Sequence, residues 1–361
     1  MNTAKELAGL VGFDGKQSVL SVYLDTDLSD KSKDDVKLML RQRIKTLEHP
    51  PSQADVERLF RFLDYEYDWQ PRGVAVFVSG DDLWRTIPLP ISVPTRAYCS
   101  TKPVVRTLVD VLDRFGRYVV ALVDREALRL FLVEGGKITP VSEVVGEELK
   151  HHRQGGWAAA RYQRHEDQLA LRNLKQALDV ISAYTADHDC ARWVLAGSED
   201  VVAQVKSLLP SALERSLIGE FAVNMAARPA EVLQRSLDVA LDADTDEERQ
   251  LVSETITAAN KGGAGVIGLA DSLYSLQEGR VRLLLVDEDY STPGTMCTQC
   301  EYIAPSLSGT CPFCGGIEFR EVGDAVDRAI HKAIETGASV NIVRENEELQ
   351  RAGRIAALLR Y

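Results

Sequence analysis

The sequence predicts an α/β protein built from several domains. Apolar segments typical of strands alternate with segments of helical periodicity along the whole chain. The length of 361 residues exceeds that of an ordinary single domain and predicts two or three. Hydrophobic content of 45% and charged content of 27% are ordinary for a globular protein with a sizeable core.

Composition also predicts the compartment. No apolar run is long enough to span a membrane, and the N-terminal sequence MNTAKELAGLVGF lacks the pattern of a signal peptide. Six cysteines are too few for a disulfide scaffold in a chain of this length. The net charge of -12 argues against a general nucleic-acid coat but allows one basic face. We therefore expect a cytoplasmic protein without membrane association.

The first domain is predicted to span residues 1–114. A strand at 17–24 precedes a helix that Ser32 caps and that Pro50 and Pro51 terminate, with apolar residues at helical spacing. The further predicted elements are a helix at 54–67 and strands at 73–79 and 86–92.

The second domain is predicted at residues 115–229 and the third at 230–361. The second should contain a hairpin at 117–124 and 128–141, a continuation of that sheet at 138–149, a helix at 157–187, a strand at 191–200 and a helix at 208–217. The third should contain helices at 230–259, 269–277 and 324–337, and strands at 280–289, 338–343 and 353–361. We interpret the acidic segment 242–248 as solvated helix surface.

Four cysteines form two CxxC pairs, separated by ten residues. A CxxC turn places two thiolates on one side of a tight loop, and two facing turns make the tetrahedral sulfur site typical of structural Zn²⁺. The predicted zinc ligands are Cys297, Cys300, Cys311 and Cys314, in an inserted ribbon at 295–318. Redox pairs are the alternative, but neither pair precedes a helix of thioredoxin type. Cys99 and Cys190 are expected to be buried apolar residues.

A basic segment surrounds two glycines at residues 151–168, HHRQGGWAAARYQRHEDQ. Gly155 and Gly156 allow close approach of the backbone to another surface, and Trp157 offers a ring for stacking on a base. The surrounding cations are Lys150, Arg153, Arg161, Arg164, Arg172 and Lys175. This combination favours contacts with phosphates and bases.

Simpler interpretations of this segment stay open. The two glycines alone are compatible with an ordinary loop before a helix, and Trp157 with an anchor that packs the loop onto its own domain. The arginines are compatible with a solvated helix face, paired in part with Glu166 and Asp167. His151, His152 and His165 have no cysteine or carboxylate cluster beside them, so RNA contacts or solvation are favoured over metal binding.

The segment resembles the tip of the middle domain in archaeal and eukaryotic class I release factors. There a basic stretch leads into Gly-Gly-Gln and then into a helix start of the type S-A-x-R-F-x-R. Here Trp157 replaces the glutamine, and Arg161-Tyr162-Gln163-Arg164 follows three alanines. Other stretches resemble the same family in the same order: 115–124, 194–199, 273–289, 338–343 and 353–361. The chain is identified as a bacterial-type relative of these factors and of Pelota.

The resemblance implies a three-domain, release-factor-like architecture. An α/β N-terminal domain, an RNase H-like middle domain and a ribosomal-protein-like C-terminal domain carrying the zinc ribbon are expected. The family reads stop codons with an Asn-Ile-Lys-Ser loop, but the corresponding region 45–54, KTLEHPPSQA, has no such motif. Stop-codon reading is therefore not expected.

The resemblance further implies a ribosome-binding factor that occupies the A site in hibernation or rescue. Its tip at the peptidyl-transferase centre would contact rRNA, and tRNA as a further partner, through Arg153, Gln154, Gly155, Gly156, Trp157, Arg161 and Arg164. The factor would be a monomer, delivered by a translational GTPase such as elongation factor Tu if it is delivered at all.

Two other functions compete with this one. Peptidyl-tRNA hydrolysis needs a backbone N–H and a small polar side chain at the tip to position water. The Trp157 indole cannot replace the carboxamide and Gln154 precedes the glycines, so no catalytic residue is predicted and the non-enzymatic binder is favoured. A zinc-ribbon adaptor without a role at the ribosome is the third possibility.

Overall fold

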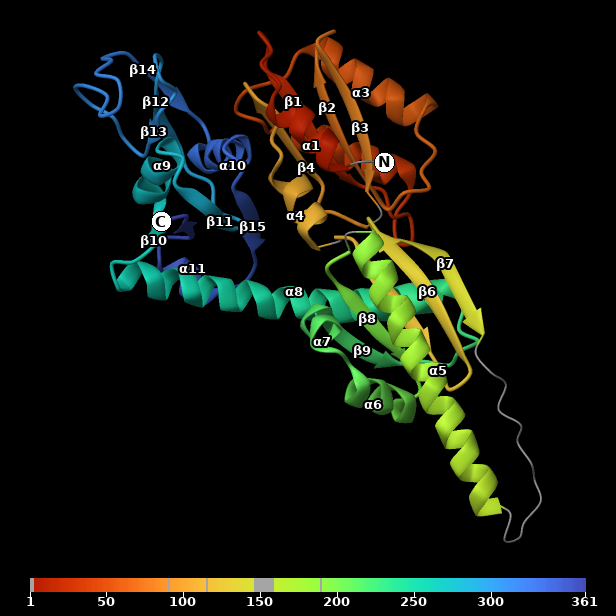
Figure 1. Ribbon diagram of the computed structural model, residues 1–361. Helices are drawn as coiled ribbons and strands as arrows, with labels where there is room; N and C mark the ends of the chain where they lie inside the picture. Colours follow the sequence, from red (N-terminus) through yellow and green to blue (C-terminus); the bar gives the residue numbers. More distant parts are fainter. Residues whose placement is uncertain (1–2, 90, 115, 146–158, 189) are drawn as a thin grey trace. The chain divides into compact units, whose positions relative to one another are not determined.

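The structure is a computed structural model that describes residues 3–89, 91–114, 116–145, 159–188 and 190–361 (Figure 1). Its fold is mixed α/β, as predicted. The chain divides into two compact units: the first unit comprises Met1–Asp113 and Glu247–Tyr361, and the second unit comprises Arg114–Asp246. Among the described helices, none has the length and apolarity that a membrane span requires.

The N-terminal part of the first unit is a four-stranded antiparallel sheet with the order β3-β2-β1-β4. Its strands are β1 (Val19–Asp25), β2 (Gly73–Ser79), β3 (Leu83–Leu89) and β4 (Arg96–Ser100). Its helices are α1 (Thr3–Val11), α2 (Lys33–Lys45), α3 (Gln53–Tyr65) and α4 (Arg106–Arg114). One apolar face of β1 packs against α2 and α3. Ser32 begins α2 with a capping box, as its position before the periodic apolar residues predicts.

The C-terminal part of the first unit contains a four-stranded sheet with the order β10-β16-β11-β15. Its strands are β10 (Gly265–Ile267), β11 (Val281–Asp287), β15 (Ser339–Val343) and β16 (Ile355–Leu359). Its helices are α9 (Leu269–Gln277), α10 (Ala325–Glu335) and α11 (Glu347–Arg351). β11 runs parallel to β15 and antiparallel to β16.

A small three-stranded sheet is inserted between β11 and α10. It consists of β12 (Gly294–Cys297), β13 (Ile303–Ala304) and β14 (Phe319–Val322), with β12 in the centre. Tyr274 of α9 packs on Phe313 beside this sheet, with the ring centroids 4.9 Å apart. Aromatic packing therefore fastens the inserted sheet to its own domain.

The second unit is built on a five-stranded sheet with the order β7-β6-β5-β8-β9. Its strands are β5 (Tyr118–Val123), β6 (Ala127–Glu134), β7 (Lys137–Val145), β8 (Trp193–Gly197) and β9 (Leu217–Ala222). Its helices are α5 (Ala159–Asp187), α6 (Glu199–Leu208), α7 (Ser211–Ser216) and the first part of α8 (Pro229–Asn260). β5, β6 and β7 are antiparallel neighbours, whereas β5, β8 and β9 run parallel.

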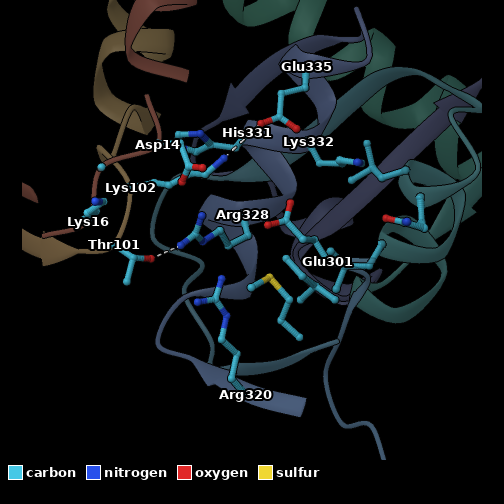
Figure 2. Close-up of a pocket in the computed structure, with 16 residues that line it drawn as sticks. Asp14, Lys16, Thr101, Lys102, Glu301, Arg320, Arg328, His331, Lys332 and Glu335 are labelled. Atoms are coloured by element: carbon cyan, nitrogen blue, oxygen red, sulfur yellow. Dashed lines mark hydrogen bonds and ion pairs between the residues drawn. The ribbon is translucent and has the colours of Figure 1, made fainter. Parts of the chain in front are cut away.

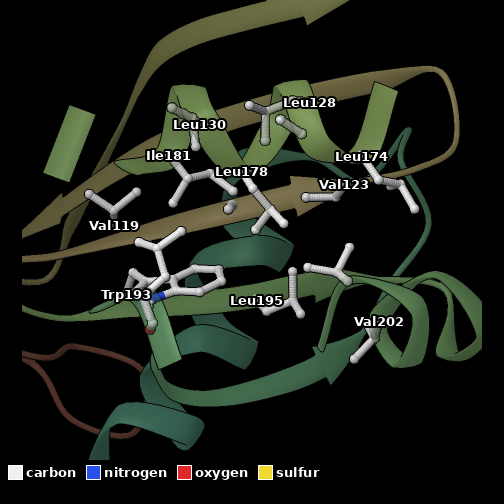
Figure 3. Packing of buried hydrophobic residues seen from close by; sticks show 14 of the residues in the cluster. Val119, Val123, Leu128, Leu130, Leu174, Leu178, Ile181, Trp193, Leu195 and Val202 are labelled. Atoms are coloured by element: carbon white, nitrogen blue, oxygen red, sulfur yellow. Dashed lines mark hydrogen bonds between the residues drawn. The ribbon is translucent and has the colours of Figure 1, made fainter. Parts of the chain in front are cut away.

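Both faces of this sheet are buried. Alternate residues of β5 point to opposite sides: Val119 packs with α5 and α6, and Val120 packs with α8. On the α5 side, Leu174 and Leu178 cover the strands beside Trp193 (Figure 3). The Trp193 indole N–H donates to the Leu213 carbonyl at 2.9 Å, which satisfies its buried polar atom. Burial on two faces explains the continuous apolar runs that predicted these strands.

Two expectations from the sequence are wrong. The acidic segment of α8 is not uniformly solvated, because Asp244 and Glu248 are buried. Asp244 forms an ion pair with Arg192, a residue far away in the sequence, and this pair offsets the cost of removing the carboxylate from water. Cys99 lies in β4 and is half-exposed, whereas Cys190 is buried as expected.

Candidate functional site

In the sequence, the predicted tip follows an edge strand and precedes a long helix. Strand β7 ends at Val145 and helix α5 begins at Ala159. The tip residues Arg153, Gln154, Gly155, Gly156 and Trp157 lie outside the described residues. Arg161 and Arg164 belong to the described backbone of α5, but their side chains lie outside the description.

Helix α5 consists of a packed part and a projecting part. Among its described side chains, the first buried one is Ala170, and burial then recurs at helical spacing through Leu174, Leu178 and Ile181. The preceding turns, 159–169, correspond to about 16 Å of helix at 1.5 Å per residue. Figure 1 shows this part of α5 extending past the strands of its own unit. We call residues 159–169 the arm.

The arm continues into an exposed basic face of α5. Arg172 and Lys175 are exposed and lie on the side of the helix away from Leu174. Arg161, Arg164 and Arg172 are separated by three and eight residues, so the helix places their Cα atoms near one side. The N-terminus of a helix also carries partial positive charge, which favours anions there. The arm thus joins the predicted tip to a basic surface.

The structure brings the four predicted metal ligands together. All four Sγ atoms lie within 4.8 Å of one another. The Cys297 and Cys314 sulfurs are 3.6 Å apart, and the Cys300 and Cys311 sulfurs are 3.5 Å apart, so each close contact joins one CxxC pair to the other. Such a set of four sulfur donors, with no open position for substrate, fits a structural metal ion.

The two CxxC turns share one backbone hydrogen-bond pattern. In the first, Cys297 donates its N–H to the Tyr302 carbonyl at 2.9 Å, and the Glu301 N–H returns to the Cys297 carbonyl at 3.0 Å. In the second, Cys311 and Gly315 make the equivalent bonds at 2.8 and 2.9 Å. The residue after each second cysteine is left-handed, with φ of 58° at Glu301 and 75° at Gly315. Both turns therefore hold their thiols in the same way.

Backbone groups favour the metal-binding form of the Cys297 thiol, whereas burial raises the pKa of the Cys300 thiol to about 12. The N–H groups of Cys300 and Gln299 point at the Cys297 sulfur and lower its pKa to about 7. A thiolate is the form that ligates a metal. Tyr302 and Phe313 pack beside the cluster with ring centroids 4.7 Å apart, which limits access of water. β13 and β14 follow the two CxxC turns, so neither turn precedes a helix in the manner of a thioredoxin motif.

A cavity in the first unit was not anticipated from the sequence. Arg320, Arg328, His331 and Lys332 line it together with Lys102 (Figure 2). These residues come from β14, α10 and the segment after β4, and only the tertiary fold brings them together. The single sequence signal is local: residues 328 and 332 are four apart and therefore share one side of α10.

The region that corresponds to the codon-reading loop of release factors lies between α2 and α3. Helix α2 ends at Lys45 and α3 begins at Gln53, and Ser52 caps α3 by accepting a hydrogen bond from the Asp55 N–H at 3.2 Å. This region is a short connection between two helices that pack on the same sheet.

Sequence comparison relates the chain to peptide chain release factors. The family model named bacterial archaeo-eukaryotic release factor family 10 matches residues 103–241. Peptide chain release factor subunit 1 of Pyrococcus abyssi is 22% identical over 395 aligned positions, which cover 95% of this chain and 93% of that protein. The corresponding protein of Archaeoglobus fulgidus is 24% identical, with 92% and 90% covered. The chain is thus similar to archaeal peptide chain release factors over most of its length, and to a bacterial family related to them over residues 103–241, in line with the predicted resemblance.

Solved structures of this class are also similar to the chain. Archaeoglobus fulgidus Pelota matches with a TM-score of 0.38 and 14% identity, covering 80% of this chain and 79% of that one. Archaeal Pelota, from a model of its ribosome-bound form with ABCE1, matches with a TM-score of 0.43 and 13% identity, covering 99% and 94%.

Proposed function

We propose that this chain is a translation factor that binds the ribosomal A site and places its Gly155-Gly156-Trp157 tip at the peptidyl-transferase centre. Its role there is to occupy the site during ribosome hibernation or rescue, and not to hydrolyse peptidyl-tRNA. The match to release factor subunit 1 over 95% of the chain carries this proposal, because it places the chain in a class whose relatives are named for peptide chain release.

The arm supports a role in reaching a distant surface. The described side chains of the arm, at 166–169, are not buried, so they add no buried contact to the core of the second unit. A projecting helix of this kind suits contact with another molecule. The flanking cations suit phosphates of rRNA, although the chain as a whole has a net charge of -12.

The chemistry of the tip favours binding over hydrolysis. Trp157 stands where the release factors have glutamine, and an indole cannot orient a water molecule and stabilise an oxyanion as a carboxamide does. A planar ring beside two glycines suits stacking on an exposed base. Hydrolysis of peptidyl-tRNA is the second candidate function, and its support is the backbone N–H that Trp157 retains.

We further propose that the metal is Zn²⁺ and that its role is structural. Four thiolate donors suit Zn²⁺ well, and the two equivalent CxxC turns present these donors with the same backbone geometry. The proposed domains are 1–114, 115–229 and 230–361, with the metal-binding insertion at 295–318. Elongation factor Tu is the proposed GTPase partner if delivery to the ribosome requires one.

The test is co-sedimentation with 70S ribosomes over a series of salt concentrations. The triple variant Arg153→Glu, Arg161→Glu, Arg164→Glu should bind more weakly, and the slope of log K against log salt should become less steep by about 0.9 for each lost phosphate contact. The matched control reverses three exposed cations of the same unit away from the arm, at Lys206, Arg215 and Arg228.

Both triple variants change the net charge by the same amount, so their difference isolates the position of the charge. We expect the control to retain most of the binding of the wild type. Equal loss in both variants would show that overall charge, and not the arm, determines sedimentation. Unchanged binding in the arm variant would reject the basic face as the contact.

A further inference from the structure

A cavity of about 210 Å³ opens among α10, β14 and the segment that follows β4, all within the first unit. Its size suits a small ion or a single functional group of a larger ligand, since whole drug-sized ligands occupy about 300–1,000 Å³. Cationic side chains outnumber carboxylates in its lining by five to three. The chain as a whole has a net charge of -12, so this local excess of positive charge in the cavity favours the binding of an anion.

Two guanidinium groups in this cavity face each other without a carboxylate between them. Figure 2 shows the Arg320 side chain reaching from β14 toward Arg328 of α10. Burial lowers the pKa of the Arg328 guanidinium, the neighbouring Asp327 carboxylate raises it, and the positive charge of Arg320 lowers it again. Arg328 donates to the Thr101 hydroxyl, a neutral acceptor, and neither arginine forms an ion pair within the described part of the chain. The two like charges repel each other, and an anion bound between them would relieve this repulsion.

Two of the three carboxylates of the lining form no ion pair with these arginines. Glu335 is engaged with Lys102, with Oε1 and Nζ 3.4 Å apart. Glu301 stabilises the charge of Arg328 only from beyond ion-pair distance, and its backbone is fixed by the first CxxC turn. Lys332, one turn further along α10 than Arg328, has no ion-pair partner among the described residues.

His331 adds a buried acceptor to this cationic site. Its side chain is 2% exposed, and its Nε2 lies 2.7 Å from the Pro103 carbonyl and 3.7 Å from Oδ2 of Asp327, two acceptors that require a proton on Nε2. In the neutral imidazole, Nδ1 then carries a lone pair, and this atom is buried without a hydrogen-bond partner among the described residues. A buried unpaired acceptor is unfavourable by itself, so the cavity is incomplete without a group that donates to it.

We propose that this cavity binds a hydrogen-phosphate group, with Arg320 and Arg328 holding its oxygens and His331 Nδ1 accepting its O–H. The two guanidinium groups match the geometry of phosphate oxygens and provide several charge-assisted hydrogen bonds. The lone pair of Nδ1 can accept a hydrogen bond from the O–H of hydrogen phosphate. It therefore favours this ion over an oxyanion of the same shape that has no O–H. The group is either the free ion or the singly protonated phosphate of a nucleotide. This site is separate from the tip, and its test does not require a ribosome.

The experiment is calorimetric titration of the full-length, metal-loaded protein with inorganic phosphate and with sulfate at constant ionic strength and pH 7. Phosphate should bind at least about tenfold more tightly than sulfate, because sulfate has no O–H for Nδ1. Arg320→Gln should weaken phosphate binding by about tenfold or more, since it removes charge-assisted hydrogen bonds. Arg282→Gln, at an exposed arginine of β11 outside the cavity, should leave binding unchanged.

His331→Phe tests the acceptor directly. It removes both ring nitrogens and keeps a planar ring, so the preference for phosphate over sulfate should disappear. Arg320 is exposed, so Arg320→Gln is expected to fold, and the melting temperature of each variant checks this. Equal affinity of the wild type for phosphate and sulfate, equal losses in Arg320→Gln and Arg282→Gln, or no binding at about 10 mM phosphate would each overturn the proposal.

Two further titrations identify the source of the phosphate. Tighter binding of adenosine monophosphate than of inorganic phosphate would assign the site to a nucleotide phosphate, and weaker binding would assign it to the free ion. An RNA trinucleotide without terminal phosphates carries only diester groups, which have no O–H. Preferred binding of this trinucleotide would overturn the role given to His331, because the site would then select phosphodiesters.

Discussion

The metal-binding sheet and the arm of α5 differ in which interactions determine their geometry. In the sheet, neighbouring residues fix the sulfurs through backbone hydrogen bonds, and the two CxxC turns repeat the same pattern. In the arm, no described side chain before Ala170 is buried in the unit that carries it, and the helix continues beyond its support. Nearby residues therefore determine the geometry of the sheet, and a bound metal ion stabilises it. The geometry of the arm follows from its own helical hydrogen bonds, and a binding partner would supply its remaining contacts.

This difference predicts where mutations will have their effects. Changes at the metal site should appear as lost stability of the isolated protein. Changes in the tip should leave stability intact and appear only when a partner is present. Variants at the two regions can therefore be distinguished by measuring stability and ribosome binding separately.

Cys311→Ser should abolish stable metal binding, because a serine hydroxyl is a poor replacement for a thiolate. Structural Zn²⁺ sites in small domains are worth about 10–16 kcal/mol at pH 7, so the inserted sheet should unfold. Elemental analysis should fall from one zinc per chain toward zero, and hydrogen exchange should rise in β12 to β14. The strands β1 to β4 should stay protected.

Cys99→Ser is the control for this prediction, because Cys99 is half-exposed in β4 and lies outside the cluster. It should keep the full metal content. A Cys311→Ser protein that also retained one zinc per chain would show that the four sulfurs do not form the site.

Asp244→Ala should destabilise the body of the second unit by about 2–3 kcal/mol. Breaking a fully buried ion pair costs about 3–5 kcal/mol, but the Arg192 side chain is 27% exposed and water compensates part of the loss. Chemical denaturation measures the change. Asp242→Ala, at an exposed aspartate in the same helix, should change stability by less than about 0.5 kcal/mol. Equal effects of the two variants would contradict the assignment of Asp244 to a buried pair.

Trp157→Ala should weaken binding to 70S ribosomes by up to about a hundredfold, because stacking on a base is worth about 1–3 kcal/mol. The melting temperature should stay that of the wild type. Loss of thermal stability with unchanged ribosome binding would support the alternative that Trp157 packs the loop onto its own domain.

Trp157→Gln separates the two candidate functions of the tip. It restores the Gly-Gly-Gln of the release factors and should give at most weak release of labelled formyl-methionine from initiated ribosomes. The wild type should give none. Robust release by the wild type would move the protein to the peptidyl-tRNA hydrolases.

Glu301→Gly should give the smallest effect, a stabilisation of about 0.5–1 kcal/mol. The left-handed backbone at Glu301 costs a residue with a Cβ about 1–2 kcal/mol, and the greater freedom of glycine in the unfolded chain offsets part of the gain. Glu301→Ala removes the same carboxylate but keeps the Cβ, so it should show no such gain. Thermal unfolding of the metal-loaded protein compares them.

Features fixed by nearby residues could be predicted from the sequence. Helix α9 occupies the predicted residues 269–277, Ser32 caps α2, and the four cysteines converge as their spacing indicates. These features depend on short-range periodicity, caps and turns, which a single sequence displays directly.

Features that depend on distant partners were missed. β4 and β9 were not predicted, because their residues are mostly half-exposed and show no alternation of apolar and polar side chains. The burial of Asp244 depends on Arg192, and the cavity depends on residues from separate elements around His331. No local pattern reveals such pairs, since their energy comes from tertiary proximity.

The backbone hydrogen-bond pattern that the two CxxC turns share determines which of their positions can accept other residues. The hydrogen bonds that position the thiols come from main-chain groups, which every residue except proline supplies in full. The side chains of Thr298, Gln299 and Pro312 between the cysteines are exposed. These positions should therefore tolerate almost any residue in a selection for folded, metal-loaded protein, whereas Phe313, which packs on Tyr274, should accept only bulky apolar replacements.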